Sequence, residues 1–190
     1  MVDFSRDVKA CVQILKEHGV ILYPTDTVWG IGCDATHAGA VEKVFALKHR
    51  PPQKSLIILL ADARDILKHV AAPPPDIISW VEKFERPTTL IFQGAIGFAE
   101  NAIGEDGSVA IRIPNDPFCK ALLKRFGKPL ISTSANINGE PTAQIFTDIN
   151  PVITAGCDYV VHYRRDDINK TAPSRILKIL DDGEVTVVRE

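Results

Sequence analysis

Short runs of large apolar residues recur along the chain, and their length predicts buried strands. Runs of roughly four to eight such residues, bounded by Gly, Pro or polar positions, are typical of strands and too short for most helices. Asp182 and Gly183 lie between the last two runs and predict a hairpin turn. The runs cover residues 20–23, 56–60, 86–92, 108–114, 128–131, 158–162, 174–180 and 185–189.

Apolar residues three and four positions apart predict helices between these strands. We expect Gly19 to end the first helix and Gly127 to end the last, because glycine adopts the left-handed conformation of a helix C-terminus at little cost. Three prolines at residues 73–75 predict a corner within one domain. The expected helices cover residues 5–18, 38–48, 62–70, 77–84 and 116–126.

Composition narrows the class of protein. The 190 residues are 45% hydrophobic and 24% charged, which predicts one globular domain over residues 1–190. A net charge of −2 argues against a dedicated nucleic-acid coat protein but leaves room for a local basic groove. The 4 cysteines stand far apart, so we expect buried thiols in a reducing compartment. No signal peptide or membrane span is evident, and a cytoplasmic location is expected.

The turn after the first strand, residues 24–33, is unusually rich in groups that can line a ligand site. It holds three threonine and aspartate side chains in a row, and two glycines that would let a ligand approach the backbone. Lys48 and Arg50 leave the following helix, where they could reach a phosphate or a carboxylate. The alternative is that the hydroxyls only cap the turn and the cations only complement the helix dipole.

Residues 30–35 also match the G-x-G-x-x-A pattern of dinucleotide-binding folds. A proline and a polar turn separate this pattern from its strand, and Arg50 stands where the acid that binds ribose is expected. We therefore reject a dinucleotide site.

Two further features favour an anion site. Residues 132–136, STSAN, place hydroxyls and an amide directly after a short apolar strand, where they can donate to phosphate or accept from amines, although such a segment is also an ordinary loop. Arg112 lies between Ile111 and Ile113 and requires an anion, either a ligand or an acidic residue of the chain.

Motifs for other chemistry are absent. The sequence has no Walker A loop, no G-x-S-x-G elbow, no H-E-x-x-H and no Cys/His cluster with metal-ligand spacing, so no metal-ligating residue is expected. The five histidines are scattered singly and are expected at the surface or in the core rather than as ligands. Hydroxyls and cations remain, which suit an anionic substrate and catalysis by positioning and charge stabilisation.

Four motifs together resemble the YrdC-like threonylcarbamoyl-AMP synthase family, in its short form. They are YPTDTVWGIG at residues 23–32, KHRP at 48–51, VAIR at 109–112 and STSAN at 132–136. The resemblance implies a single α/β domain with a twisted mixed sheet, flanking helices and a concave, positively charged groove. It also implies that L-threonine, bicarbonate and ATP react to threonylcarbamoyl-AMP and pyrophosphate, for the t6A modification of tRNA.

The resemblance further implies roles for individual residues. Mg²⁺ would arrive with ATP, bound to phosphate oxygens. Tyr or Phe is usual at the position of Trp29, and one branch of the family has a threonine-contacting His at the position of Leu59. The implied catalytic residues are Lys48, Arg50 and Arg112; the threonine-binding residues are Thr27, Ser134 and Arg175; the nucleotide-binding residues are Arg50, Lys54, Arg112, Ser132, Asn136, Gln144 and Arg189.

Two alternatives remain open. The departures at Leu59 and at Arg175, where many members of the family have Thr, motivate a non-catalytic paralogue that binds double-stranded RNA, tRNA or a nucleotide in tRNA or ribosome maturation. The other is a carbamoyl-transfer module of the kind fused into hydrogenase maturation proteins, which the lack of an acylphosphatase-like or zinc-finger region disfavours. As a synthase, the protein would pass its product to a tRNA threonylcarbamoyl transferase complex, with no membrane partner.

Overall fold

The computed structural model describes residues 3–51, 56–180 and 183–190. Within these ranges, nine strands form one sheet in the order β7-β1-β2-β6-β3-β5-β4-β8-β9. They are β1 (Ile21–Tyr23), β2 (Gly30–Gly32), β3 (Ile57–Leu59), β4 (Thr88–Phe92), β5 (Val109–Arg112), β6 (Leu130–Ser134), β7 (Tyr159–Val160), β8 (Arg175–Ile179) and β9 (Val185–Arg189). Each predicted apolar run contains a strand except residues 128–131, which cover only the start of β6.

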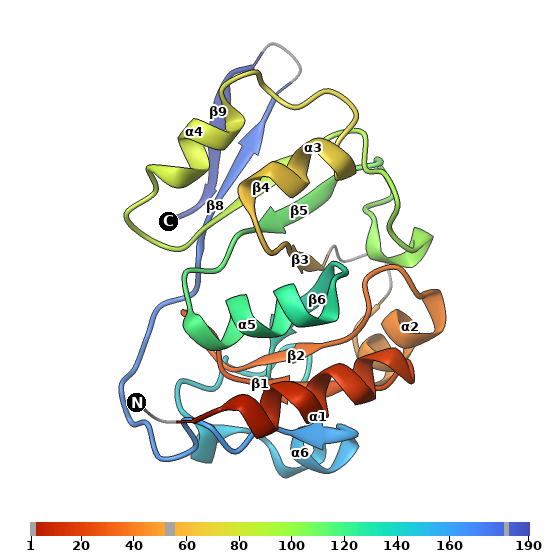
Figure 1. Cartoon of the computed structure of the whole chain (residues 1–190), viewed down its shortest axis with the longest axis vertical. Coiled ribbons are helices and arrows are strands. Elements are labelled where there is room, and N and C mark those ends of the chain that lie inside the picture. Colours follow the sequence, from red (N-terminus) through yellow and green to blue (C-terminus); the bar gives the residue numbers. More distant parts are fainter. Residues whose placement is uncertain (1–2, 52–55, 181–182) are drawn as a thin grey trace.

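The sheet is mixed, as expected for this α/β fold. Parallel pairs join β1 to β7, β3 to β5 and β4 to β8, whereas the other neighbours are antiparallel. Figure 1 shows β1, β2 and β7 in the lower half of the molecule and β3, β4, β5, β8 and β9 in the upper half. Strand β6 lies between the two sets and belongs to both.

Helices cover the sheet, and five of them were expected from the apolar spacing. α1 and α5 pack against one another across the lower half (Figure 1). α6 and the 3₁₀ turns η2 and η3 lie outside the predicted helices. The helices are α1 (Ser5–Lys16), α2 (Ala38–Leu47), α3 (Ile66–His69), α4 (Ile77–Glu82), α5 (Pro117–Phe126) and α6 (Pro151–Gly156), and the 3₁₀ turns are η1 (Ala63–Asp65), η2 (Glu100–Ala102) and η3 (Phe146–Asp148).

The end of α1 differs from the prediction. His18, not Gly19, adopts the left-handed conformation, with φ of 59°. The amides of His18 and Gly19 then donate to the carbonyls of Leu15 and Ile14, which is the hydrogen-bond pattern of a Schellman motif. Gly19 is required for space instead, because a Cβ there would lie 2.6 Å from Cγ2 of Ile14. Gly127 ends α5 as predicted, with φ of 75°.

Strand β2 corrects a second prediction, since residues 30–32 were expected to belong to a turn. Gly30 and Ile31 pair with Ser134 and Thr133 of β6, and all three residues of β2 pair with β1. A Cβ at Gly32 would lie 2.7 Å from Cε1 of Tyr23 and 2.8 Å from the carbonyl oxygen of Ile131. Glycine is therefore required at position 32 by close packing inside the sheet, and not because a ligand approaches its backbone.

Strand β6 corrects a third prediction and joins the two halves of the sheet. Residues 132–134 were expected in a turn, but they continue the strand. The first part of β6 pairs with β3, through Leu130, Ile131 and Ser132, and its last part pairs with β2. The hydroxyls of β6 consequently stand at the point where the sheet passes from one half to the other.

The described cysteines are free thiols, and two of the histidines stack on one another. Cys11, Cys33 and Cys119 are buried free thiols, and Cys157 is a half-buried one. Burial raises the pKa of Cys157 to about 12, and the nearby charge of Asp158 acts in the same direction. The histidines are not all isolated, because the rings of His18 and His37 stack with centroids 3.7 Å apart.

Candidate functional site

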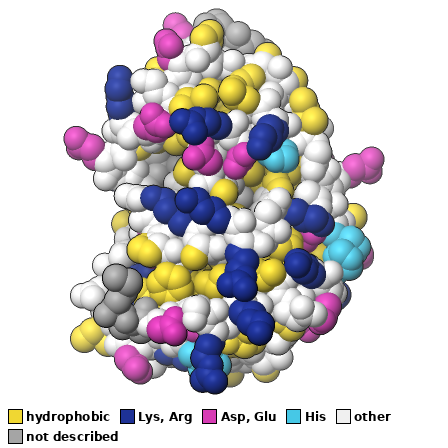
Figure 2. Space-filling model, in the orientation of Figure 1, with side chains coloured by type: hydrophobic (Ala, Val, Ile, Leu, Met, Phe, Trp, Pro, Cys, Tyr) yellow, Lys and Arg dark blue, Asp and Glu magenta, His cyan; other side chains and the backbone are white. Residues whose placement is uncertain are grey.

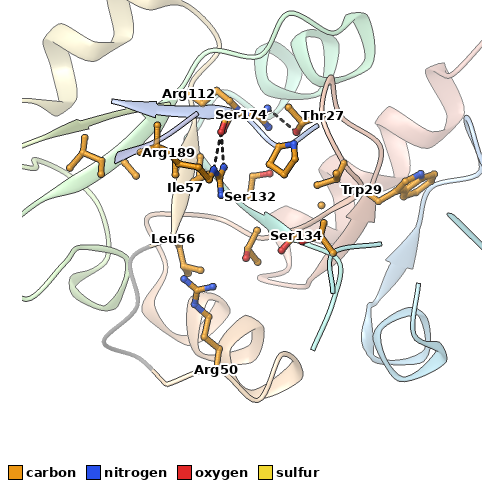
Figure 3. A pocket seen from close by; sticks show the side chains of 18 residues that line it. Thr27, Trp29, Arg50, Leu56, Ile57, Arg112, Ser132, Ser134, Ser174 and Arg189 are labelled. Carbon is orange, nitrogen blue, oxygen red and sulfur yellow. Dashed lines mark hydrogen bonds between the residues drawn. The ribbon is translucent and has the colours of Figure 1, made fainter. Parts of the chain in front are cut away.

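A pocket with a volume of about 260 Å³ opens beside β6, where the two halves of the sheet meet. Its lining comes from segments far apart in the sequence, so the fold rather than any local motif assembles it. Figure 3 shows Arg112, Arg189 and Ser174 on one side of the pocket and Arg50 on the opposite side. Its lining residues are Thr27, Val28, Trp29, Gly30, Arg50, Leu56, Ile57, Ile91, Ala110, Arg112, Ser132, Thr133, Ser134, Thr142, Pro173, Ser174, Ile176 and Arg189.

Arg112 is a buried cation in this wall, with only 4% of its surface exposed. Its Nη1 donates to Oδ1 of Asp26 and to Oγ1 of Thr27, both at 3.0 Å. Of the two kinds of anion that the sequence left open for Arg112, the structure shows an acidic residue of the chain, Asp26. The buried Nε of Arg112 has no hydrogen-bond partner, so the guanidinium keeps a donor for another acceptor.

Asp26 and Thr27 reach this position through the turn between β1 and β2. Oγ1 of Thr25 accepts from the amide of Thr27 at 3.0 Å and lies 2.8 Å from the carbonyl oxygen of Val28, to which it donates. This side-chain turn directs Thr27 into the pocket and Asp26 behind it. Thr25 itself is buried beneath the turn and does not belong to the lining.

Arg189 approaches Arg112 from the last strand of the sheet. Its Nη2 donates to the carbonyl oxygen of Ser174 at 2.7 Å (Figure 3). The hydroxyl of Ser174 lies 2.8 Å from that of Thr89. Partial burial lowers the pKa of Arg189, and repulsion by Arg112 lowers it further. Two guanidinium groups thus share this end of the pocket, which favours an anion between them.

The end of α2 explains why Lys48 and Arg50 face different surroundings. His49 adopts a left-handed conformation with φ of 50°, and the amide of Arg50 donates to the carbonyl oxygen of Phe45 at 2.9 Å. This reversal directs Arg50 to the pocket. Lys48 turns inward instead, and its Nζ donates to the carbonyl oxygens of Ser134 and Asn136.

Lys48 is therefore placed beneath the pocket, with 1% of its surface exposed. Burial lowers its pKa to about 8, and the charge of Arg50 contributes to the same shift. Burial also lowers the pKa of Arg50. Lys48 therefore holds the end of β6 and the residues that follow it in position. It is not among the residues that line the pocket, so its geometry does not support the predicted catalytic role.

The structure brings six of the predicted site residues into one pocket, and the other described ones do not line it. Asn136 lies behind the lining, where its Nδ2 donates to the carbonyl oxygens of Ile137 and Glu140 at 2.9 Å. Arg175 lies over the ring of Phe84. Gln144 is not among the described lining residues, and Lys54 lies outside the described residues. Those in the pocket are Thr27, Arg50, Arg112, Ser132, Ser134 and Arg189.

Several lining residues were not predicted. Thr142, Pro173 and Ser174 come from irregular segments whose path depends on distant contacts, and no local pattern marks them. Trp29 does form an aromatic wall, with its ring 4.9 Å from that of Phe146, as expected for an aromatic residue at this position. Leu59 is fully buried in β3 and does not line the pocket.

The chemistry of the lining suits recognition of an anion. Among the described lining residues there are three guanidinium groups and several hydroxyls but no carboxylate. The described residues contain no group of three or more His, Cys, Asp or Glu side chains that could hold a metal ion. In the same part of the chain, no helix has the length and apolar character needed to cross a membrane.

The fold and the pocket define the class of protein, an α/β protein with a cationic site. Its similarity to known proteins shows the family. A model of the Sua5/YciO/YrdC family, described as telomere recombination, matches residues 13–190. A threonylcarbamoyl-AMP synthase of Pseudoalteromonas translucida is 34% identical over 81% of this chain and 84% of its own. One from Xanthomonas euvesicatoria is 36% identical over 82% and 84%. The chain therefore belongs to the Sua5/YciO/YrdC family.

Solved structures agree on the fold. P. abyssi Sua5 complexed with L-threonine superposes with a TM-score of 0.87 at 20% identity. The match covers 100% of this chain and 55% of that one, so the chain spans about half the length of that Sua5. At this identity the likeness concerns the fold alone.

Proposed function

We propose that the protein is an L-threonylcarbamoyladenylate synthase and a nucleotidyltransferase, which forms threonylcarbamoyl-AMP and pyrophosphate from L-threonine, bicarbonate and ATP. The observation that carries this proposal is the convergence of Arg50, Arg112 and Arg189 on a pocket lined with hydroxyls. Relatives more than 30% identical over most of the chain bear the name of this enzyme. The product serves the t6A modification of tRNA.

The proposed reaction has two steps, and in both the protein holds reactants together. The amine nitrogen of L-threonine attacks the carbon of bicarbonate, and hydroxide leaves as water with a proton of the amine. One oxygen of the resulting carbamate attacks the α-phosphorus of ATP, the bond from this phosphorus to the bridging oxygen breaks, and pyrophosphate leaves. Alignment of the carbamate with the α-phosphate provides most of the acceleration.

The three arginines supply the charge that this second step requires. Negative charge builds on the departing pyrophosphate, and cations held in place beforehand stabilise it without reorganisation. Arg112 is fixed by Asp26 and Thr27, and Arg189 by the carbonyl of Ser174. We assign Thr27 and Ser134 to L-threonine, because a hydroxyl can accept from its amine or donate to its carboxylate.

Mg²⁺ enters this proposal as part of the substrate. The described lining offers no carboxylate, so its donor set does not fit a resident Mg²⁺. The ion binds well to phosphate oxygens and keeps several water ligands, and ATP brings it into the pocket in that form.

RNA and a tRNA threonylcarbamoyl transferase complex are proposed partners downstream of the reaction. Figure 2 shows Lys and Arg side chains over the middle and lower part of the face that α1 and α5 cover, with acidic side chains scattered among them. Contact with RNA through such a surface would weaken with salt, because phosphate contacts release counterions.

The test is release of pyrophosphate from ATP with bicarbonate, with and without L-threonine, followed by mass detection of the adenylate. Release that depends on L-threonine and yields the expected adduct supports the proposal. Folded protein that binds ATP or RNA but releases no pyrophosphate at any L-threonine concentration contradicts it and favours a non-catalytic paralogue.

A pair of variants links the activity to the pocket. Arg50→Ala is expected to abolish turnover while unfolding stays cooperative, because Arg50 faces the pocket. Arg125→Ala, at an exposed position of α5, is the matched control and should keep full turnover. Loss of cooperative unfolding in Arg50→Ala would assign its charge to the fold rather than to the reaction.

A further inference from the structure

Residues 164–174, which we call the strap, connect β7 to β8 and pass from the lower half of the molecule to the upper half. Figure 1 shows this blue segment at the left, running along the side of the molecule without a helix or strand. Most of its side chains are exposed, and Ile168 is 77% exposed. The end of the strap contributes Pro173 and Ser174 to the pocket.

The strap contacts the turn between β1 and β2 at two carbonyl groups. Nη1 of Arg164 donates to the carbonyl oxygen of Thr25 at 3.2 Å, and Oγ1 of Thr171 donates to that of Thr27. Thr25 and Thr27 are 2% and 8% exposed, so their carbonyl groups need partners inside the protein. The strap supplies these partners from 139 and 144 residues away in the sequence.

Arg164 is held in an unusual backbone conformation while it makes this contact. Its φ is 66°, in the left-handed region that non-glycine residues rarely adopt. Its guanidinium group also donates to Oδ2 of Asp116 at 3.0 Å and to Oδ2 of Asp167 at 3.3 Å. Such strain persists where surrounding contacts over-determine the backbone, and it is concentrated at functional sites.

The turn that Arg164 holds sets the direction in which Thr27 donates and accepts. The hydroxyl proton of Thr25 goes to the carbonyl oxygen of Val28, so Oγ1 of Thr25 must accept from the hydroxyl of Thr27, 2.9 Å away. Oγ1 of Thr27 already accepts from Arg112. Toward the pocket, Thr27 therefore offers a lone pair and accepts a hydrogen bond from a donor on the ligand.

We propose that Arg164 is a positioning residue of the pocket, which acts through the carbonyl of Thr25 to hold the turn that presents Thr27 as an acceptor. Thr171 assists from the same strap through the carbonyl of Thr27. Loss of either contact frees a buried carbonyl group and lets the turn rotate, so the acceptor no longer meets the donor on the ligand. The activity readout of this inference rests on the proposed function, whereas its structural readout does not.

Arg125, at an exposed position of α5, provides the control for Arg164. Arg165, the next residue, is not suitable, because its guanidinium group lies 5.0 Å from the centroid of the Phe146 ring, which packs on Trp29. Thr154 matches Thr171, because its hydroxyl donates to the carbonyl oxygen of Pro151 in α6.

The first readout is acrylamide quenching of Trp29 in a Trp80→Phe background, which needs no substrate. Trp29 follows the turn and is 6% exposed, so loosening of the turn should increase quenching. We expect the increase in Arg164→Gln and Thr171→Val, and not in Arg125→Gln or Thr154→Val. If Arg164→Gln does not fold, Thr171→Val compared with Thr154→Val carries the same test.

The second readout is the split between KM and kcat. We expect Arg164→Gln to raise the KM for L-threonine about tenfold, with a smaller change in kcat, because misplacement of a binding group by a fraction of an ångström weakens recognition. Equal effects of Arg164→Gln and Arg125→Gln on both readouts would overturn the proposal. So would a lower melting temperature in Arg164→Gln with unchanged quenching and KM, since this is the result of a merely structural role.

The two proposals fail differently. If the wild-type protein makes no adenylate but Arg164→Gln still increases the quenching of Trp29 relative to Arg125→Gln, the proposed function is wrong and the positioning role stands. If the adenylate forms but neither readout separates the two variants, the proposed function stands and the role of Arg164 is wrong.

Discussion

Arg112 and Asp26 form an ion pair whose two members face different cavities. Arg112 lines the substrate pocket, whereas Asp26 lines a second cavity of about 470 Å³ on the other side of the pair. The two side chains are 4% and 11% exposed, and Oδ2 of Asp26 also accepts from the amide of Asn115 at 3.0 Å. The carboxylate of Asp26 thus holds the wall between the two cavities through its contacts with Arg112 and the amide of Asn115.

Asp26→Asn is expected to lower the free energy of unfolding by about 3 kcal/mol, because it leaves a buried guanidinium group without its counterion. Urea denaturation measures this change. The control is Glu190→Gln, which removes the exposed ion pair between Glu190 and Arg86 and should cost less than about 1 kcal/mol. Similar losses in the two variants would mean that the Arg112–Asp26 pair is no better desolvated than a surface pair.

Lys48 predicts a dependence of stability on pH. Its pKa is lowered to about 8 by burial and by Arg50, whereas an unfolded chain holds this proton up to about pH 10.4. Between these values the unfolded state binds more protons, so this group makes the free energy of unfolding rise with pH, by at most about 1.4 kcal/mol per unit. Below pH 8 the contribution is flat.

Lys48→Met removes this slope, and the difference between wild type and variant isolates it. Subtraction is necessary because buried Cys and Tyr groups with raised pKa values contribute a slope of the opposite sign in the same range. Denaturation at several pH values from 7 to about 10 provides the measurement. Lys124→Met, at an exposed position of α5, should leave the slope unchanged. An identical slope in wild type and Lys48→Met would contradict the lowered pKa.

His49→Gly is expected to raise the free energy of unfolding by up to about 1 kcal/mol, since glycine accepts the left-handed conformation without the steric cost that other residues bear. His49→Val should lower it, because a branched side chain fits this conformation poorly. Ala46→Gly, at an exposed position inside α2, should have the opposite effect to His49→Gly and cost about 1 kcal/mol. Thermal unfolding distinguishes these signs, and a stabilising His49→Val would refute the argument from φ.

Gly32→Ala is expected to destabilise the sheet by about 1–3 kcal/mol, because the added methyl group would press on the ring of Tyr23 and on the backbone of β6. Tyr23 is fully buried and has no room to withdraw. Gly39→Ala, at an exposed position of α2, serves as the control and should cost less, since alanine favours the helix and the added methyl group meets only the half-buried ring of His37, at 3.3 Å. Equal stability of Gly32→Ala and wild type would show that the sheet yields locally.

The sequence predicts those features that depend on neighbours in the chain. Apolar runs locate the strands, and the spacing in α1, α2 and α5 locates the helices, because burial of one face acts on each element separately. Strand β2 escapes this reasoning, since Gly30 and Gly32 resemble a turn and become a strand only between β1 and β6.

The same distinction applies to the site. Thr27, Arg50, Arg112, Ser132 and Ser134 could be predicted because each belongs to a motif with distinctive chemistry, whereas Arg189 was implied by the family resemblance alone. Thr142 and Ser174 could not, because their places depend on the path of irregular segments. The left-handed conformation of His49, which turns Lys48 and Arg50 to different surroundings, could not be predicted from the KHRP motif either.

Strand β6 makes the pocket a property of both halves of the molecule. A bound substrate would contact Thr27 and Trp29 of the lower half of the molecule and Arg112 and Arg189 of the upper half. It would therefore link the two halves non-covalently. Mass action then stabilises only those molecules in which the whole sheet is intact. Substrate should therefore slow amide exchange in the outer strands of each half, far from any atom that it touches.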